Sequence, residues 1–180
     1  MPFIDYRIHF HHPANNFVKG DLWGTQSEHE FGNRFADTFS KSFNSNIIAI
    51  RELPVPGSGI ADFVVIKPSE SIKKSNSKTS VQAFEFKLKN WRNGLMQAHR
   101  YKYFSNSSIL VMPMDNIKPA QESLDLFKQL GVGLWAFNAS SGAITKRFTP
   151  RPKKVLDVKR AAYILEKIFE PRIHSCERSL

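Results

Sequence analysis

The sequence predicts an α/β domain in which a mixed β-sheet is flanked by helices, and three patterns support this fold class. Two apolar segments, 60–66 and 81–88, have strand character and are joined by a polar connection. Phenylalanines recur every four residues from Phe31 to Phe43, which is the period of a helix that buries one face. Between residues 108 and 137, a strand, a helix and a strand alternate, which is typical of parallel pairing.

The phenylalanine-rich helix has a clear start signal. Ser27 followed by Glu30 forms a capping-box pattern, so the helix begins directly after Ser27. At about 100° per residue, Glu30 falls on the polar face, whereas Glu28 falls on the phenylalanine face. Glu28 is therefore either a first-turn residue favoured by the helix dipole or a functional carboxylate.

The next elements lead to a charged pair of strands. Residues 46–53 form a strand that ends near Glu52, and the Pro- and Gly-rich turn 54–59 leads into Asp62. In the following strand, Glu85 and Lys87 are two residues apart and share one face. The opposite face is apolar, with Phe84, Phe86 and Leu88.

Antiparallel pairing of these two strands brings Asp62 close to Lys87, so two carboxylates and an ammonium meet at a sheet edge. This grouping suggests a metal site with a lysine beside it. The alternative is a half-solvated hairpin whose Glu-x-Lys face meets water. The connection 67–80 is serine-rich and basic, and is either a segment that closes over DNA or a solvent loop.

The second half of the chain continues the alternation. We expect a helix over 93–104, in which Gln97 and Tyr101 share a face. Further elements are strands at 108–112 and 132–137, a helix at 120–130, a hairpin strand within 142–148 and a closing helix at 155–169. The closing helix is expected to pack Leu156, Ile164, Leu165 and Ile168.

Composition limits the class of protein. The chain has 180 residues and 41% hydrophobic residues, enough for one domain over residues 27–180 behind an N-terminal arm of residues 1–26. His9, His11 and His12 in that arm are expected at the surface rather than on a metal. We find no apolar run of bilayer length and no signal peptide, so we expect a soluble, cytoplasmic protein without a membrane partner.

The charge points to a polyanionic partner. Lys and Arg number 26 against 16 Asp and Glu, giving a net charge of +10 and a pI near 9.8. The high aromatic content favours nucleic acid over a membrane surface. The single cysteine, Cys176, excludes an internal disulfide and a cysteine-ligated iron–sulfur cluster.

Asp62, the tripeptide Glu85-Phe86-Lys87 and the pair Gln97 and Tyr101 together resemble the motifs of the PD-(D/E)XK nuclease superfamily. The resemblance is to its RecB-type branch, in which the E-x-K strand precedes a helix bearing Q-x-x-x-Y. It covers roughly residues 27–137. The proline that usually precedes the aspartate is Ala61 here.

The resemblance implies a restriction-endonuclease-like fold and a metal-dependent DNA endonuclease. Mg²⁺, or Mn²⁺ in its place, is then held by Asp62, Glu85 and the backbone carbonyl of Phe86. The first helix of the family supplies a further acidic residue, a role that fits Glu28 or its rival Glu52, with Glu28 favoured. The catalytic set implied is Asp62, Glu85, Lys87, Gln97 and Glu28.

Cations and aromatics around this set are the expected nucleic-acid contacts. The candidates are Lys89, Trp91, Arg92, Arg100, Tyr101, Arg147, Arg151, Lys153 and Lys154. Trp91 either stacks on a base or covers the seam between helix and sheet, and Tyr101 either braces its helix or contacts the DNA backbone. Cleavage of both strands needs two active sites, so we expect a homodimer or a partner subunit.

Three other functions remain open at the level of sequence. One is a catalytically silent nuclease-fold module that only binds DNA or RNA. Another is a protein that cleaves or binds RNA, because no residue identifies a 2′-hydroxyl reader. The last is a basic adaptor protein that binds no divalent cation and whose Glu-x-Lys pair lies at the surface without a function.

Overall fold

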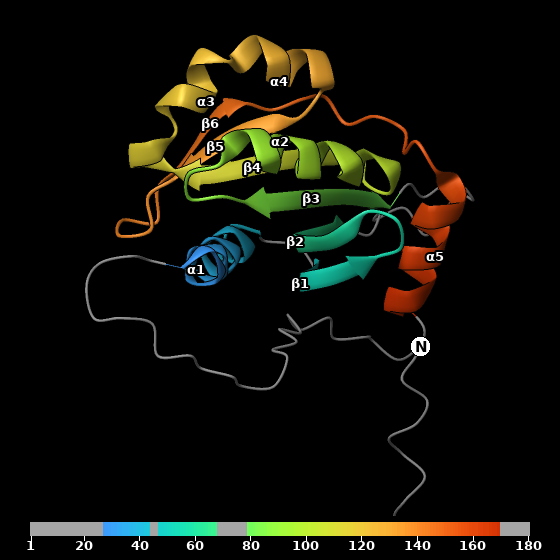
Figure 1. Ribbon diagram of the computed structural model, residues 1–180. Coiled ribbons are helices and arrows are strands. Elements are labelled where there is room, and N and C mark those ends of the chain that lie inside the picture. Colours follow the sequence, from blue (N-terminus) through green and yellow to red (C-terminus); the bar gives the residue numbers. More distant parts are fainter. Residues whose placement is uncertain (1–26, 44–46, 68–78, 170–180) are drawn as a thin grey trace, which may run out of the picture.

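A computed structural model describes residues 27–43, 47–67 and 79–169. The proposed arm of residues 1–26 with its three histidines, most of the 67–80 connection, and Cys176 lie outside these described residues. The described strands form one six-stranded mixed sheet with helices on both faces (Figure 1). The predicted α/β class with a mixed sheet flanked by helices is therefore confirmed.

The strands follow one another across the sheet in chain order, β1-β2-β3-β4-β5-β6. The first three strands pair antiparallel, β3 to β5 pair parallel, and β6 returns antiparallel to β5. Helices occupy the crossovers between the parallel strands, as such connections require. The strands are β1 Ile48–Val55, β2 Gly59–Lys67, β3 Ser80–Phe86, β4 Ser107–Pro113, β5 Gly133–Phe137 and β6 Ile144–Phe148.

Helix α1, Glu28–Lys41, begins where the sequence predicts it. The Ser27 hydroxyl accepts a hydrogen bond from the Glu30 amide at 3.1 Å, but the Glu30 carboxylate pairs with Arg34 instead of closing the capping box. The phenylalanines of the helix lie on one face of the sheet and meet aromatic side chains from the strands, which makes an aromatic core of Phe31, Phe35, Phe39, Phe63, Phe84, Phe86, Trp135 and Phe137.

The opposite face of the sheet carries the other described helices (Figure 1). These are α2 Trp91–Arg100, the 3₁₀ turns η1 Tyr101–Tyr103 and η2 Met114–Asn116, α3 Lys118–Glu122, α4 Leu124–Leu130 and α5 Val158–Phe169. Helices α2 and α4 cover β4 and β5, and α5 covers the β1–β2 hairpin. The described helices are all too short or too polar to cross a lipid bilayer.

Several element boundaries differ from the sequence-based predictions. The expected helix over 120–130 is two helices that break at Ser123, and Gly131 ends the second with a φ of 65°. The expected packing of Leu156 is wrong, because α5 begins at Val158 and Leu156 is 60% exposed. Ile164 is buried as predicted, since it lies within the helix proper.

Candidate functional site

The backbone ladder between β2 and β3 stops at the Phe63–Phe84 pair, one residue before Asp62 and Glu85. Beyond that point, the Phe86 amide donates to the Asp62 carboxylate at 2.8 Å instead of to a backbone carbonyl. Burial raises the pKa of Asp62, and the Phe86 N–H together with the charge of Lys87 partly opposes this shift. The end of the hairpin thus holds an aspartate in a partly buried position.

Glu85 is the most buried charged residue of this region, with 1% of its surface exposed. Its Oε1 lies 3.1 Å from the Lys87 ammonium, and its Oε2 contacts the hydroxyl of Tyr101. Burial first, and then repulsion from Asp62, raise the pKa of Glu85 to about 7. Near neutral pH this carboxyl is therefore about half protonated.

Tyr101 fixes the position of Glu85. Its hydroxyl lies 2.8 Å from the Ile60 carbonyl as well as against Glu85. A phenol has one proton and donates to one of these oxygens at a time. When it donates to Glu85, it stabilises the charged carboxylate and so opposes the rise in the pKa of Glu85 that burial and Asp62 cause.

Lys87 joins β3 to helix α1. Its ammonium lies 3.1 Å from Glu85 and 3.1 Å from Glu28. Burial opposes its charge, but the attraction of the two glutamates outweighs burial and raises the pKa of Lys87. The other oxygen of Glu28 accepts from the Leu88 amide at 3.2 Å, so α1 is tied to the turn that follows β3.

Glu52, the rival of Glu28, faces a different partner. It is the one non-glycine residue with a positive φ among the described residues, at 53°. Its carboxylate lies 2.8 Å from Nδ1 of His29. The structure therefore brings Glu28, and not Glu52, into contact with Lys87.

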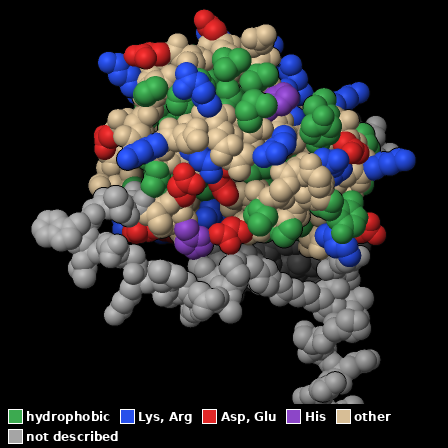
Figure 2. Space-filling model, viewed as in Figure 1, with side chains coloured by type: hydrophobic (Ala, Val, Ile, Leu, Met, Phe, Trp, Pro, Cys, Tyr) green, Lys and Arg blue, Asp and Glu red, His purple; other side chains and the backbone are tan. Residues whose placement is uncertain are grey.

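Figure 2 shows acidic side chains and a histidine gathered over the region of α1, with basic side chains spread over the rest of this face.

Asp62, Glu85 and Lys87 form what we call the cluster. Arg51 is a buried cation beside it, and the sequence-based prediction missed this arginine. Its Nε donates to Asn33 at 3.1 Å, its guanidinium lies 5.0 Å from the centre of the Phe86 ring, and its charge acts on Asp62. Burial lowers the pKa of Arg51. An arginine inside the apolar strand 48–55 is the signal that identifies it in the sequence.

Helix α2 covers the cluster through one face. A Cβ at Gly94 would lie 2.6 Å from Cγ of Lys87, so glycine allows this close approach. Gln97 and Tyr101 follow on the same face, three and seven residues later. Oε1 of Gln97 is buried and has no hydrogen-bond partner among the described residues. The predicted pair Gln97 and Tyr101 is thus turned toward the sheet.

The cluster offers oxygen ligands that suit a hard divalent cation. Asp62 and Glu85 lie at the end of the hairpin, where burial raises the pKa of both carboxyls and the charge of Asp62 raises the pKa of Glu85 further. Within the described ranges, no three His, Cys, Asp or Glu side chains are arranged to hold a metal ion. Mg²⁺ commonly takes one or two carboxylates and keeps several waters, so the two carboxylates and the Phe86 carbonyl fit its ligand preference.

Two of the predicted nucleic-acid contacts are in the core. Trp91 is 6% exposed and packs against Phe127 between α2 and α4, and Tyr101 is 1% exposed beside Glu85. These rings do not present a face to a base, so the seam-packing and helix-bracing interpretations hold for them. The exposed cations on α2 and before it are Lys89, Arg92 and Arg100.

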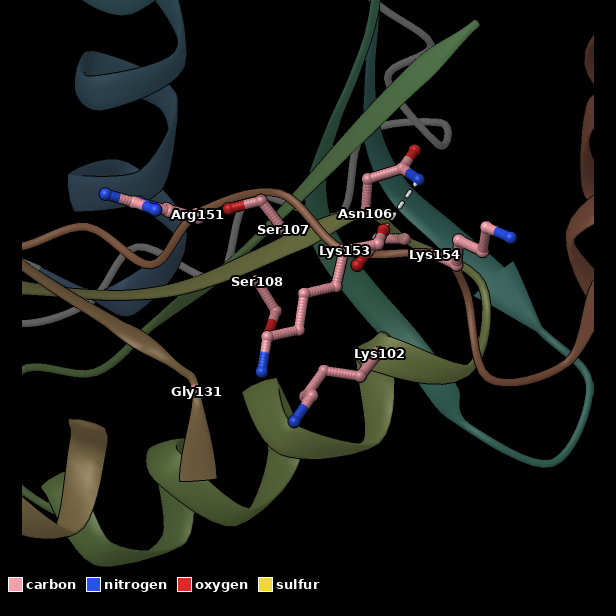
Figure 3. Close-up of a pocket in the computed structure, with 9 residues that line it drawn as sticks. Lys102, Asn106, Ser107, Ser108, Gly131, Arg151, Lys153 and Lys154 are labelled. Atoms are coloured by element: carbon pink, nitrogen blue, oxygen red, sulfur yellow. Dashed lines mark hydrogen bonds between the residues drawn. The ribbon is translucent and has the colours of Figure 1, made fainter. Parts of the chain in front are cut away.

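The remaining predicted contacts lie away from the cluster. Arg147 is exposed on the edge strand β6. The exposed Arg151, Lys153 and Lys154 lie beside Ser107 and Ser108 at the start of β4 (Figure 3). The start of β4 pairs with Gln82, three residues before Glu85, so this group lies about 10 Å or more from the carboxylates along the sheet.

No protein-family model and no curated protein match the sequence. Among solved structures, the chain is similar to SPO1766, a protein of unknown function from Silicibacter pomeroyi. The identity is 16%, the TM-score is 0.49, and the similarity covers 81% of this chain and 96% of that chain. A likeness at this level bears on neither the fold nor the function of this protein.

Proposed function

We propose that this protein is a metal-dependent nuclease that hydrolyses phosphodiester bonds in DNA on a restriction-endonuclease-like PD-(D/E)XK fold. The observation that supports it most is the cluster of Asp62, Glu85 and Lys87, drawn from adjacent strands and held within hydrogen-bonding distance of one another or of the intervening backbone. A buried carboxyl with a pKa of about 7 beside a second carboxylate is costly for folding and typical of a functional site.

The proposed roles follow from the positions of the side chains. Asp62, Glu85 and the Phe86 carbonyl would hold Mg²⁺ or Mn²⁺, which when bound polarises a phosphate and lowers the pKa of water. Lys87 orients the attacking water and stabilises negative charge that develops on the phosphate. Glu28 anchors Lys87 through their 3.1 Å contact. The Gln97 oxygen, which has no partner among the described residues, is available to accept a hydrogen bond from a water or from Lys87.

DNA is the proposed substrate because of the net charge of +10 and the exposed cations on either side of the cluster. Lys89 and Arg92, directly after β3, are the proposed contacts next to the scissile phosphate. Cutting of both strands requires two such clusters, so the working form is proposed to be a homodimer or a complex with a partner subunit.

The test is cleavage of supercoiled plasmid and short duplexes in Mg²⁺ or Mn²⁺. We expect cutting by the intact protein and a loss of at least 100-fold in Asp62→Ala and Lys87→Ala at matched DNA binding. Glu122→Gln, a change at an exposed glutamate of α3, is the control and keeps full activity. Equal activity in all four proteins would show that a contaminant cuts the DNA.

A nucleic-acid-binding module without catalysis is the alternative. It is favoured by the fact that both oxygens of Glu85 already have protein partners, Lys87 and Tyr101. A structural role for the cluster predicts DNA binding without cutting and no calorimetric signal with either divalent cation. Metal binding without cutting of these DNAs points instead to another substrate or a missing subunit.

A further inference from the structure

A small cavity lies at the start of β4, on the side of the sheet covered by α2 and α4, and no step of the proposed hydrolysis uses it. Its nine lining residues include four cations and no acidic residue, and they come from η1, the start of β4, the end of α4 and the segment before α5 (Figure 3). They are Lys102, Ser105, Asn106, Ser107, Ser108, Gly131, Arg151, Lys153 and Lys154. We call this the β4 cavity.

The cations of the β4 cavity have no acidic partner. No described carboxylate forms an ion pair with Lys102, Arg151, Lys153 or Lys154. Lys102 and Lys153 instead repel each other: burial and the charge of Lys153 both lower the pKa of Lys102. Figure 3 shows both ammonium groups directed to the same side as the Ser108 hydroxyl. Two cations that lie close together without an ion pair to any described carboxylate favour the binding of an anion.

Two buried hydroxyls at the start of β4 also lack partners among the described residues. Ser107 is 6% exposed and Ser108 is 0% exposed, and neither Oγ has a hydrogen-bond partner within the described part of the chain. Buried polar groups are almost always hydrogen-bonded, so a buried hydroxyl without a partner indicates a place where a ligand oxygen can bind. Successive strand residues point to opposite faces of the sheet, so Ser108 lies on the α2 side with Leu110, whereas Ser107 lies on the α1 side with Ile109. The Ser108 hydroxyl can therefore donate to an oxygen that enters the cavity.

The basic segment is fixed against the cavity by backbone hydrogen bonds. The Lys153 amide donates to the Asn106 carbonyl at 2.9 Å, and the Asn106 side chain donates back to the Lys153 carbonyl at 2.9 Å. The Leu156 amide donates to the Lys102 carbonyl at 3.0 Å. The Lys102 ammonium donates one of its three N–H groups to the Leu130 carbonyl at 2.6 Å, so two N–H groups can donate to a ligand. The backbone that carries Lys153 is therefore fixed beside Lys102.

The size of the cavity restricts the ligand. Its volume of about 10 Å³ is that of roughly one water molecule. A tetrahedral oxyanion can place one oxygen inside, against the Ser108 hydroxyl and Lys102, and leave its other oxygens outside for Lys153. Figure 3 shows Arg151 and Lys154 directed away from this point. A carboxylate is less suited, because its two oxygens lie in one plane and three donor groups converge here.

We propose that the β4 cavity binds a phosphate group, with Lys102, Lys153 and Ser108 as its main ligands. The phosphate belongs either to a nucleic-acid strand or to a small phosphorylated molecule. The assignment to a nucleic-acid strand rests on the proposed function. A strand phosphate here would fix the DNA at a point separate from Asp62 and Glu85, by contacts that do not depend on base sequence.

The first experiment titrates inorganic phosphate into the ¹⁵N-labelled protein at constant ionic strength. We expect saturable shifts at the amides of Ser107, Ser108 and Gly131. Ser108→Ala removes only an unpartnered hydroxyl, so it folds and weakens phosphate binding several-fold. Lys153→Met weakens binding at least tenfold, whereas Lys159→Met, which removes an exposed cation on α5, changes it less than twofold. Shifts that never saturate, or equal losses in Lys153→Met and Lys159→Met, overturn the proposal.

The second experiment separates the two sources of phosphate. If the phosphate is part of a strand, Lys153→Met lowers the slope of log Kd against log salt for a labelled DNA duplex by about one. An unchanged slope with retained binding of inorganic phosphate by the wild type supports a small phosphorylated ligand. Absence of both DNA cleavage and divalent-cation binding in a wild type that binds phosphate saturably overturns the hydrolytic function alone and leaves this site intact.

Discussion

The hydroxyl of Tyr101 contacts the carboxyl of Glu85 inside the protein and lies 2.8 Å from the Ile60 carbonyl. One phenol thus links the 3₁₀ turn after α2 to both strands of the charged hairpin. The contact explains how a glutamate with 1% exposure is accommodated in the sheet.

Tyr101→Phe is expected to lower the free energy of unfolding by about 1–3 kcal/mol, because it leaves the Ile60 carbonyl and one Glu85 oxygen buried without this partner. Tyr103→Phe is the matched control: Tyr103 is exposed two residues later, and its hydroxyl makes no described hydrogen bond. Urea unfolding at pH 7 measures both variants. Equal effects of the two substitutions contradict the assigned role of Tyr101.

The raised pKa of Glu85 predicts how stability depends on pH. The group binds its proton more tightly in the folded state, at about 7, than at its ordinary value of 4.5. Between these values the folded protein holds more protons than the unfolded chain, so stability falls as pH rises through this window. The total loss from this group is about 3 kcal/mol by pH 8.

Glu85→Gln removes this titration. Relative to wild type, the variant is expected to gain stability on going from pH 5 to pH 8, as measured by urea unfolding at several pH values without divalent cations. Glu122→Gln serves as the exposed control and should follow the wild-type curve. If the difference between Glu85→Gln and wild type is the same at pH 5 and pH 8, Glu85 titrates normally in the folded protein.

Gly94→Ala is expected to destabilise the protein although alanine favours a helix. The added Cβ would lie 2.6 Å from Cδ1 of Leu110 and 2.6 Å from Cγ of Lys87, and such overpacking typically costs about 1–3 kcal/mol. The added Cβ also displaces the Lys87 side chain, so we expect DNA cleavage to drop by more than the loss of folded protein explains. Asn93→Ala, exposed on the same helix, is the control for helix propensity and should keep activity.

Rates of DNA cleavage distinguish the role of Glu28 from that of Glu52. Glu28→Gln weakens the ion pair with Lys87, so cleavage should fall at least tenfold, while Glu52→Gln, which changes a contact with His29, should lower it less than threefold. Rates at saturating metal and DNA measure this. A larger loss in Glu52→Gln assigns the third acidic position to Glu52.

The sequence by itself determined the order of the main elements and the buried faces of α1 and β3. The phenylalanine repeat specified which side of α1 is buried, and the alternation over residues 84–88 put Glu85 and Lys87 opposite the aromatic core, because side-chain direction follows from helix and strand periods alone. The antiparallel hairpin, which brings Asp62 to the end of β3, followed from the connection between two strands.

Only the tertiary structure decided which side chains contact one another. The contact of Tyr101 with Glu85, the buried Arg51 beside Asp62 and the meeting of Lys102 with Lys153 join segments whose spacing in the chain carries no period. Long-range packing also placed Trp91 between α2 and α4 and left Leu156 in solvent. Local propensity cannot predict such outcomes, because they depend on which surfaces the whole sheet brings together.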